Sequence, residues 1–290
     1  MTCCIAIRLD SGLVFLADSR TNAGVDNVST FRKLRVFEKT GDRVIVLMSA
    51  GNLSISQSVL QMLSEQIAKQ ALHIWSAHSM YQVAELVGQA VRDVHRRDAQ
   101  TLEQFNIDFN TSLLVGGQIG DEPCRLFNIY SAGNFIEASE ENPYFHIGEG
   151  KFAKPFLTTL LGSSHDLDEA TKSALIAMDA TLRLNVSVGM PLDLMVYEAG
   201  SLAVTCYKRM EENDAYFQNL RKKWAELMKA SRAQVEGPDW TEGKAVTDTL
   251  PTAASEAAPL RILPPPEAVL IKEKSLDQMA AQNAALAVSK

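Results

Sequence analysis

The sequence predicts an α+β domain in which sheets and helices form layers. Roughly the first fifty residues contain two β-hairpins, and two segments with apolar residues at helical spacing follow them. Strands, two further helices and a last pair of strands come after. This order is expected of a helix–sheet–sheet–helix sandwich. With 290 residues, the chain is long enough to bury a sizeable core.

The first predicted element is a β-hairpin close to the N-terminus. Residues 3–7 and 13–17 are apolar, and Asp10-Ser11-Gly12 has the composition of a turn. A hairpin centred on this turn pairs residues whose numbers sum to about 21. Cys3 is therefore expected opposite Asp18, and Thr2 opposite Ser19.

A second hairpin is predicted over residues 33–48. Strands over 33–37 and 43–48 flank the polar turn Lys39-Thr40-Gly41-Asp42. The paired residue numbers sum to about 81, so Lys33 faces Met48 and Ser49. If the two hairpins are neighbours in one sheet, the N-terminus and the ends of these strands gather at one edge.

The rest of the chain predicts helices in pairs, separated by strands. Ser54 is expected to cap the first helix, and Arg96 and Arg97 to mark the end of the second. The expected elements are helices over 54–71, 79–95, 151–161 and 168–183, and strands over 109–117, 124–130, a short stretch after Gly133, 193–198 and 202–208. The last two strands flank the turn Ala199-Gly200.

The composition changes at about Glu211 and again at Gly237. Residues 211–236 are charged and predict a helix, whose apolar stripe packs either on the parent domain or on a neighbouring subunit. Six of the ten prolines follow Gly237, together with many alanines. We therefore expect a main domain over 1–210, a helical extension over 211–236 and a disordered tail over 237–290.

Thr2 carries the first indication of chemistry, because it becomes the first residue if Met1 is removed. It would then hold a hydroxyl and a free α-amine on the same residue. An α-amine titrates at about 7.7–8.0, so it is suited to accept the hydroxyl proton. This pairing makes a terminal threonine a nucleophile with its own base. Alternatively, Thr2 is merely a common second residue.

Three further residues are expected at the same edge as Thr2, and each suits a role in acyl transfer. An ammonium at Lys33 would lower the pKa of the Thr2 hydroxyl and amine, and Asp18 would hold Lys33 charged. Gly51 would offer its N–H to an oxyanion. The structural alternatives are a turn residue at Asp18, a solvated charge at Lys33 and the start of a loop at Gly51.

These residues lie in a pattern that resembles the N-terminal third of proteasome β-type subunits. The pattern comprises Thr2-Cys3-Cys4-Ile5-Ala6-Ile7, the run Ala17-Asp18-Ser19-Arg20-Thr21-Asn22-Ala23-Gly24, Phe31-Arg32-Lys33-Leu34 and Ser49-Ala50-Gly51. Within that superfamily the chain is most similar to the Anbu branch, the bacterial ancestral β-subunits, also called proteasome-type proteases. The resemblance covers about residues 2–210 and implies the four-layer αββα sandwich of N-terminal nucleophile hydrolases.

The resemblance also implies roles for individual residues. Thr2 corresponds to the catalytic threonine, Asp18 and Lys33 to its charge partners and Gly51 to the oxyanion donor. Asn22 and Ser49 fall where the family binds the substrate backbone and shapes the first specificity pocket. No metal or organic cofactor is implied.

Two positions differ from the family pattern. Gly148-Glu149-Gly150 stands where the family usually has Gly-Ser-Gly before its third helix. Asn185 and Ser187 stand where it has an aspartate followed three residues later by a serine. The catalytic roles that the family gives to these positions would fall here on Glu149, Asn185 and Ser187.

The resulting prediction is a threonine-type peptidase or amidohydrolase that forms a homo-oligomeric ring or helical assembly. Its partners would be peptide or protein substrates and an ATP-dependent unfoldase. One alternative is a non-catalytic assembly subunit. Others are an amidase or amide-ligase partner acting on a small peptide-like metabolite, and a nucleophile at Cys3 instead of Thr2.

Composition excludes several other classes. A net charge of −7 argues against nucleic acid as a partner. No apolar run approaches about 18 residues, and the N-terminus lacks the pattern of a secretory signal, so we expect a cytoplasmic protein without a membrane span. The four cysteines predict buried thiols, and the five histidines do not cluster as metal ligands do.

Overall fold

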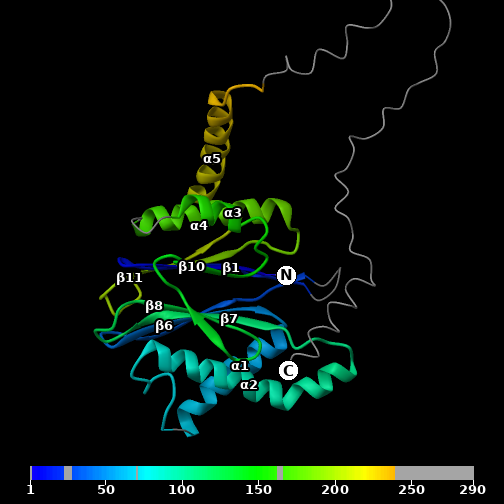
Figure 1. Cartoon of the computed structure of the whole chain (residues 1–290), viewed down its shortest axis with the longest axis vertical. Coiled ribbons are helices and arrows are strands. Elements are labelled where there is room, and N and C mark those ends of the chain that lie inside the picture. The colour runs from blue at the N-terminus through cyan, green and yellow to red at the C-terminus, as the bar shows by residue number, and fades with distance from the viewer. Residues whose placement is uncertain (1, 23–27, 70, 162–165, 239–290) are drawn as a thin grey trace, which may run out of the picture. The chain divides into compact units, whose positions relative to one another are not determined.

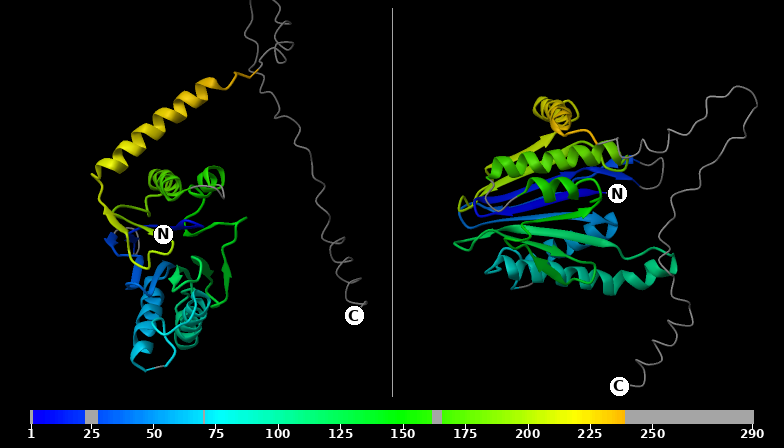
Figure 2. Two further views of the ribbon diagram at one scale, coloured as in Figure 1. Left: turned by 90° about the vertical axis from the view of Figure 1, so that its left-hand side faces the viewer. Right: turned by 45° about the horizontal axis from the view of Figure 1, so that its top comes forward.

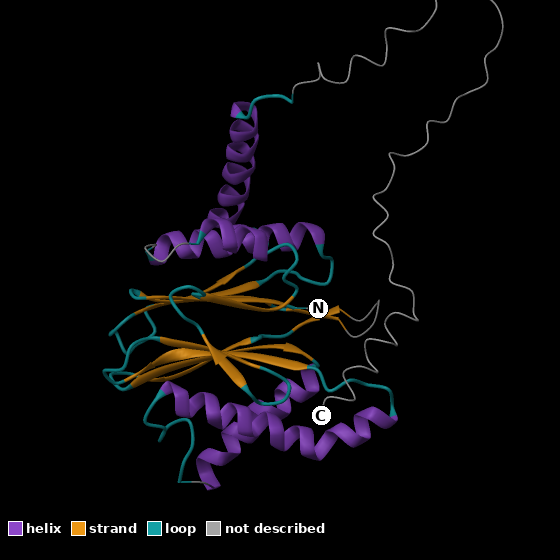
Figure 3. Cartoon of the chain, viewed as in Figure 1, coloured by secondary structure: helices purple, strands orange, loops and turns teal. Residues whose placement is uncertain are grey.

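The computed structural model describes residues 2–22, 28–69, 71–161 and 166–238. Two five-stranded antiparallel sheets pack face to face, and a pair of helices covers the outer face of each (Figures 1 and 3). The four-layer αββα sandwich expected from the sequence is therefore confirmed. None of the described helices is both long and apolar enough to cross a bilayer.

The first sheet contains both strands of the N-terminal hairpin. Its strand order is β10-β1-β2-β11-β12. The strands are β1 (Cys3–Leu9), β2 (Gly12–Asp18), β10 (Tyr144–Gly148), β11 (Leu192–Glu198) and β12 (Cys206–Met210). Helices α3 (Lys154–Leu160) and α4 (Leu167–Leu184) cover its outer face.

The second sheet is formed by the second hairpin and the strands that follow the first helix pair. Its order is β5-β6-β7-β8-β9. The strands are β5 (Leu34–Lys39), β6 (Arg43–Gly51), β7 (Thr111–Ile119), β8 (Arg125–Ile129) and β9 (Phe135–Glu137). Helices α1 (Leu53–Lys69) and α2 (Met80–Gln104) cover its outer face. Two short strands, β3 (Arg20–Asn22) and β4 (Val28–Thr30), pair separately.

Alternation along the strands divides the apolar side chains between the layers. On β1, Cys3 and Ile5 face α3 and α4, whereas Cys4 and Ala6 face the second sheet. The two sheets approach closely where Gly116 of β7 meets the ring of Phe15, since a Cβ at position 116 would lie 2.8 Å from that ring. Strands β2 and β7, which carry Phe15 and Gly116, are therefore buried on both faces over most of their length.

At one end of the sandwich, Gln118 joins the two sheets. This side chain belongs to β7, and its Oε1 accepts hydrogen bonds from the Tyr197 hydroxyl at 2.7 Å and from Gly200 N at 2.8 Å. Tyr197 lies on β11 of the first sheet and is fully buried. A buried polar contact of this kind favours one arrangement of the sheets because an unpaired amide there would be costly.

The predicted registers are correct for the first hairpin and one residue off for the second. In the first, Cys4 pairs with Ala17, so the residue numbers sum to 21. In the second, Leu34 pairs with Met48, a sum of 82, which places Lys33 next to Ser49. The difference arises because the loop takes up three residues, with Gly41 at φ +77°.

Several predicted boundaries are corrected. Helix α2 continues to Gln104 instead of ending at residue 95, because no helix-breaking residue follows Arg97. The α1 cap is Asn52, whose Oδ1 accepts from Ser54 N at 3.0 Å. The last strand starts at Cys206 instead of residue 202, since Leu202 N bonds to the Tyr197 hydroxyl and not to a strand. Strand β10 was not predicted from the sequence.

Helix α5 (Ala215–Gln234) follows β12 and is capped by Asp214, which accepts from Phe217 N at 2.9 Å. Its first part packs on the domain: Phe217 is buried, and Arg221 forms an ion pair with Asp179 of α4. From Glu226 onward its side chains are exposed, and Figure 2 shows the helix extending away from α3 and α4. The expected tail, residues 237–290, lies outside the described residues from position 239 on.

Candidate active site

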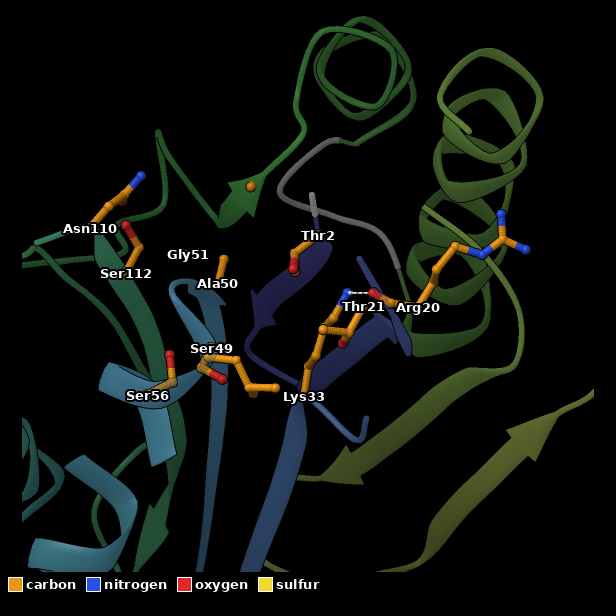
Figure 4. A pocket seen from close by; sticks show the side chains of 12 residues that line it. Thr2, Arg20, Thr21, Lys33, Ser49, Ala50, Gly51, Ser56, Asn110 and Ser112 are labelled. Atoms are coloured by element: carbon orange, nitrogen blue, oxygen red, sulfur yellow. Dashed lines mark hydrogen bonds between the residues drawn. The ribbon is translucent and has the colours of Figure 1, made fainter. Parts of the chain in front are cut away.

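A pocket of about 500 Å³ opens beside Thr2 at the end of the sandwich where β1 begins (Figure 4). It lies between the two sheets and is lined by Thr2, Arg20, Thr21, Lys33, Ser49, Ala50, Gly51, Leu53, Ser56, Asn110, Ser112 and Gly148. Most of these side chains are small or bear a hydroxyl, and none of the lining residues that the structure describes is acidic. The described walls of the pocket beside Thr2 are therefore formed mostly by small or hydroxyl-bearing residues.

Thr2 is fixed at this place by backbone contacts. It precedes β1, and its carbonyl accepts a hydrogen bond from Glu149 N at 2.6 Å. Gly148 pairs with Cys3 across β10 and β1. The Thr2 side chain points into the pocket, on the side where Lys33 lies, and only 8% of the residue is exposed.

Asp18 and Lys33 form a buried ion pair next to Thr2. Lys33 Nζ lies 2.7 Å from Asp18 Oδ1 and donates a second hydrogen bond to Arg20 O, also at 2.7 Å. Asp18 ends β2 of the first sheet, whereas Lys33 immediately precedes β5 of the second. The pair thus joins the two sheets at the pocket.

Opposing effects act on the protonation of Asp18. Burial raises the pKa of its carboxyl, whereas the Lys33 ammonium and hydrogen bonds from Cys3 N and Gly189 N lower that pKa. Cys3 N donates to Oδ1 at 2.9 Å, and Gly189 N lies 3.3 Å from Oδ2. Gly189 was missed in the sequence because nothing in the loop before β11 marks it as a partner of residue 18.

Gly51 lies at the end of β6, on the wall of the pocket opposite Thr2. Its φ is +102°, and a Cβ there would lie 2.4 Å from Asn110 O. Only glycine fits this conformation without displacing β7. Ser49 also lines the pocket, so the predicted neighbours of the threonine come together.

The residues at the two positions that differ from the family pattern contact each other. Asn185 Nδ2 donates to Glu149 Oε2 at 2.8 Å, and both residues are buried. Asn185 Oδ1 accepts from Ser187 N at 2.9 Å. Ser187 is therefore bound through its backbone N–H and does not line the pocket.

Asn22 ends β3, where its backbone pairs with Val28. Its side chain lies outside the part of the chain that the structure describes, so its predicted contact with the substrate backbone stays a prediction. Met1 also lies outside it. Asn110, Ser112 and Ser56 line the pocket but were not expected there, since their positions follow from the pairing of β6 with β7 and from the start of α1.

The structure argues against Cys3 as the nucleophile. The residue is fully buried, on the face of β1 that packs against α3 and α4. Burial, with a further effect of Asp18, raises the pKa of its thiol from 9.0 to about 12. A thiol that stays protonated and faces the core is a poor nucleophile.

Replacing Gly148 with alanine tests how tightly Thr2 is held. A Cβ there would lie 2.0 Å from Thr2 O, and the residue has φ +84°. We expect a loss of stability of at least about 1–3 kcal/mol, measured by urea unfolding. Gly200→Ala is the matched control, since Gly200 has φ +79° and nothing within 4 Å of its Cβ position. An equal loss in both variants would show that the contact with Thr2 is unimportant.

Comparisons with known proteins identify the family of this chain. A family model described as proteasome subunit matches residues 1–196. A search of the curated proteins finds no match.

Within the residues that the structure describes, no group of three or more His, Cys, Asp or Glu side chains is arranged to hold a metal ion.

Three solved structures are similar over most of this chain. Anbu (ancestral β-subunit) from Yersinia bercovieri is 46% identical with a TM-score of 0.77, and the match covers 82% of this chain and 98% of that one. Anbu from Hyphomicrobium sp. strain MC1 is 42% identical with a TM-score of 0.75 and coverages of 82% and 99%.

The third structure is described as a helical assembly of the Anbu complex from Pseudomonas aeruginosa. It is 41% identical with a TM-score of 0.78 and coverages of 82% and 98%. Sequence and fold thus agree, and the chain belongs to the proteasome subunit family and, within it, to the Anbu group of ancestral β-subunits.

Proposed function

We propose that this protein is an N-terminal threonine hydrolase that cleaves amide bonds in peptides or proteins after Met1 is removed. The observation that carries the proposal is the position of Thr2, in a polar pocket beside the buried Asp18–Lys33 pair. A nucleophile, an adjacent base and a fixed positive charge are what acyl transfer requires. Family membership supports the same reaction.

In the proposed mechanism, Thr2 Oγ attacks the amide carbonyl while its proton passes to the Thr2 α-amine. The amine then delivers this proton to the leaving nitrogen, and the C–N bond breaks to give an acyl-enzyme. Water activated by the same amine hydrolyses the ester and restores the hydroxyl. Gly51 N–H is the proposed oxyanion donor.

Lys33 is suited to stabilise the attacking oxygen. An ammonium has three N–H donors, and Asp18 Oδ1 and Arg20 O accept two of them. The third N–H of Lys33 is left for the Thr2 side chain, which lies beside it in the pocket (Figure 4). In this proposal the positive charge of Lys33 also lowers the pKa of the Thr2 hydroxyl and amine.

We also propose that the protein works as a homo-oligomer in the cytoplasm. The assembly described for the Pseudomonas aeruginosa relative and the exposed apolar side chains of α5, Tyr216, Leu227 and Met228, support self-association as a ring or a helix. An ATP-dependent unfoldase would deliver folded substrates. The substrate-binding roles of Ser49 and Asn22 belong to the same proposal.

A covalent probe tests the reaction. After incubation with a β-lactone, intact mass spectrometry is expected to show a chain without Met1 that carries one probe, and peptide mapping should place the probe on Thr2. Retention of Met1 would instead favour a non-catalytic assembly subunit. A processed chain that forms no adduct would contradict the hydrolase. Assays of peptide libraries beside small free amides then distinguish a peptidase from an amidase acting on a small metabolite.

A further inference from the structure

A second hollow, of about 740 Å³, lies between the edge strand β5 and helix α1. The apolar side chains of Phe31, Phe37 and Leu60 line it, together with polar, uncharged residues of α1. The Arg35 guanidinium also lines it and lies 5.6 Å from the centre of the Phe31 ring. None of the lining residues that the structure describes is acidic. This hollow, the β5 groove, therefore offers apolar contacts beside a positive charge.

Two guanidinium groups at this edge of the sheet have no carboxylate partner. Arg32 follows Phe31 of the groove in the chain, and both Arg32 and Arg35 are exposed. Among the residues that the structure describes, no carboxylate lies at ion-pair distance from either guanidinium. A guanidinium is weakly hydrated and forms well-defined hydrogen bonds with a carboxylate. These two groups are therefore suited to ion pairs at an interface.

The opposite edge of the same sheet carries exposed acidic residues. It consists of β9 and the loop that follows it, and residues 135–141 are named the acidic edge here. Glu140 and Glu141 are exposed, and no cation of the described residues lies at ion-pair distance from them. Ile136, in the middle of β9, is 45% exposed. The acidic edge thus presents negative charges next to an exposed apolar side chain.

The β5 groove and the acidic edge lie at the same level of the sheet. Arg35 of β5 pairs with Leu47, and Glu137 of β9 pairs with Phe127. Leu47 and Phe127 both pair with Val115 of the central strand β7, so Arg35 and Glu137 are the two ends of one row. Because β5 and β9 are at opposite edges, the two surfaces of one molecule cannot meet each other.

We propose that the acidic edge of one copy of this protein docks into the β5 groove of the next copy and so joins copies head to tail. The inference rests on the proposed function, because it specifies a contact of the proposed homo-oligomer. Ile136 contacts the apolar residues of the groove, and Glu140 and Glu141 face its two unpaired guanidinium groups. Repetition of this contact gives a ring if the rotation closes and a helix if it does not.

A second copy fits these surfaces better than an unrelated acidic protein does. Both surfaces belong to every copy, and they are complementary in charge and in apolar character. Their common level in the sheet lets successive copies repeat the contact without a change of orientation. An unrelated partner would use the β5 groove and leave the acidic edge exposed.

Charge reversal at each surface tests the contact. The groove variant carries Arg32→Glu and Arg35→Glu, and the edge variant carries Glu140→Lys and Glu141→Lys. Each variant alone brings like charges together, so the dissociation constant of self-association should rise by at least about a hundredfold. An equimolar mixture of the two variants has opposite charges at every contact and should assemble as the wild type does. Analytical ultracentrifugation measures the size of the assemblies.

The matched control carries Lys154→Glu and Lys172→Glu. It makes the same change in net charge as the groove variant, at two exposed residues of α3 and α4 that belong to neither surface. We expect it to assemble as the wild type does. A loss of assembly equal to that of the groove variant would be an effect of net charge and would overturn the inference.

The other outcomes separate this inference from the proposed homo-oligomer. If the wild type assembles and neither variant weakens it, the inference is overturned, the homo-oligomer stands, and the β5 groove is left for an acidic segment of another protein. A mixture that fails to assemble also overturns the inference. A wild type that stays monomeric at every concentration overturns both. If a charge-reversed variant does not fold, Arg35→Gln and Glu141→Gln should each weaken assembly about twofold to fivefold, and no change in either overturns the inference.

Discussion

Replacing Lys33 with methionine is expected to destabilise the protein by about 3–5 kcal/mol and to abolish acylation of Thr2. Methionine keeps much of the length of the side chain but removes the charge that lies 2.7 Å from Asp18. The Asp18 carboxylate, which is fully buried, then keeps two backbone donors among the described residues, Cys3 N and Gly189 N. Urea unfolding measures the stability, and β-lactone labelling measures the reactivity.

Lys39→Met provides the control for this change. Lys39 is exposed and forms a surface ion pair with Asp42, so its loss should cost no more than about 1 kcal/mol. A loss in Lys33→Met no larger than that of the control would show that the buried pair does not stabilise the fold. Adding Asp18→Asn to Lys33→Met should recover part of the loss, since no charge then stays buried.

The loss in Lys33→Met should become smaller as the pH falls from 7 to 5. Burial raises the pKa of the Asp18 carboxyl, and removal of Lys33 takes away the main effect that opposes this rise. The folded variant then binds a proton that the unfolded chain binds only at lower pH, so its stability increases on acidification. Urea unfolding at both pH values checks the sign. A difference between variant and wild type that stays constant would show that Asp18 is not the source.

Replacing Thr2 with alanine is expected to reduce amide hydrolysis by roughly six orders of magnitude, which is the scale of removing a serine nucleophile. Stability should change by no more than about 1 kcal/mol, because the Thr2 side chain faces the pocket and makes no hydrogen bond to the described residues. Steady-state cleavage of a fluorogenic peptide and thermal unfolding measure the two effects.

Thr2→Ser separates loss of the nucleophile from disturbance of the N-terminus. Serine is also small enough for Met1 to be removed, and it retains the hydroxyl, so it should retain most of the β-lactone labelling. Alanine allows the same processing and leaves the α-amine in place. Equal hydrolysis by wild type and Thr2→Ala would mean that a different group, or a contaminant, cleaves the peptide.

The sequence was sufficient to predict the first hairpin and, through the resemblance, the four layers. The expectation that the two hairpins are neighbours in one sheet was wrong: they lie in different sheets, and the packing of these sheets brings Lys33 to Asp18. The tight turn at Asp10-Ser11 determines the first register, and that register places Asp18 beside Cys3. The second register differs by one residue because the φ of Gly41 decides how many residues the loop takes up. Composition alone does not report that angle.

Other features near Thr2 depend on contacts between distant segments. Glu149 and Asn185 are 36 positions apart, and α3 and α4 lie between them. Their hydrogen bond therefore follows from how these helices pack and not from any local motif. Strand β10 was missed for a similar reason: it has only five residues, with one polar side chain at His146, and it is stabilised by pairing with β1.

The pair of Asp18 and Lys33 joins the two sheets at one end of the sandwich, as Gln118 does at the other. Natural selection would therefore retain the two charges for folding alone, whether or not a given copy of the protein hydrolyses amide bonds. Among diverging copies of such a protein, this ion pair would be lost later than the proposed hydrolytic activity of Thr2. The first residue of the mature chain is then the more sensitive marker of which copies are still enzymes.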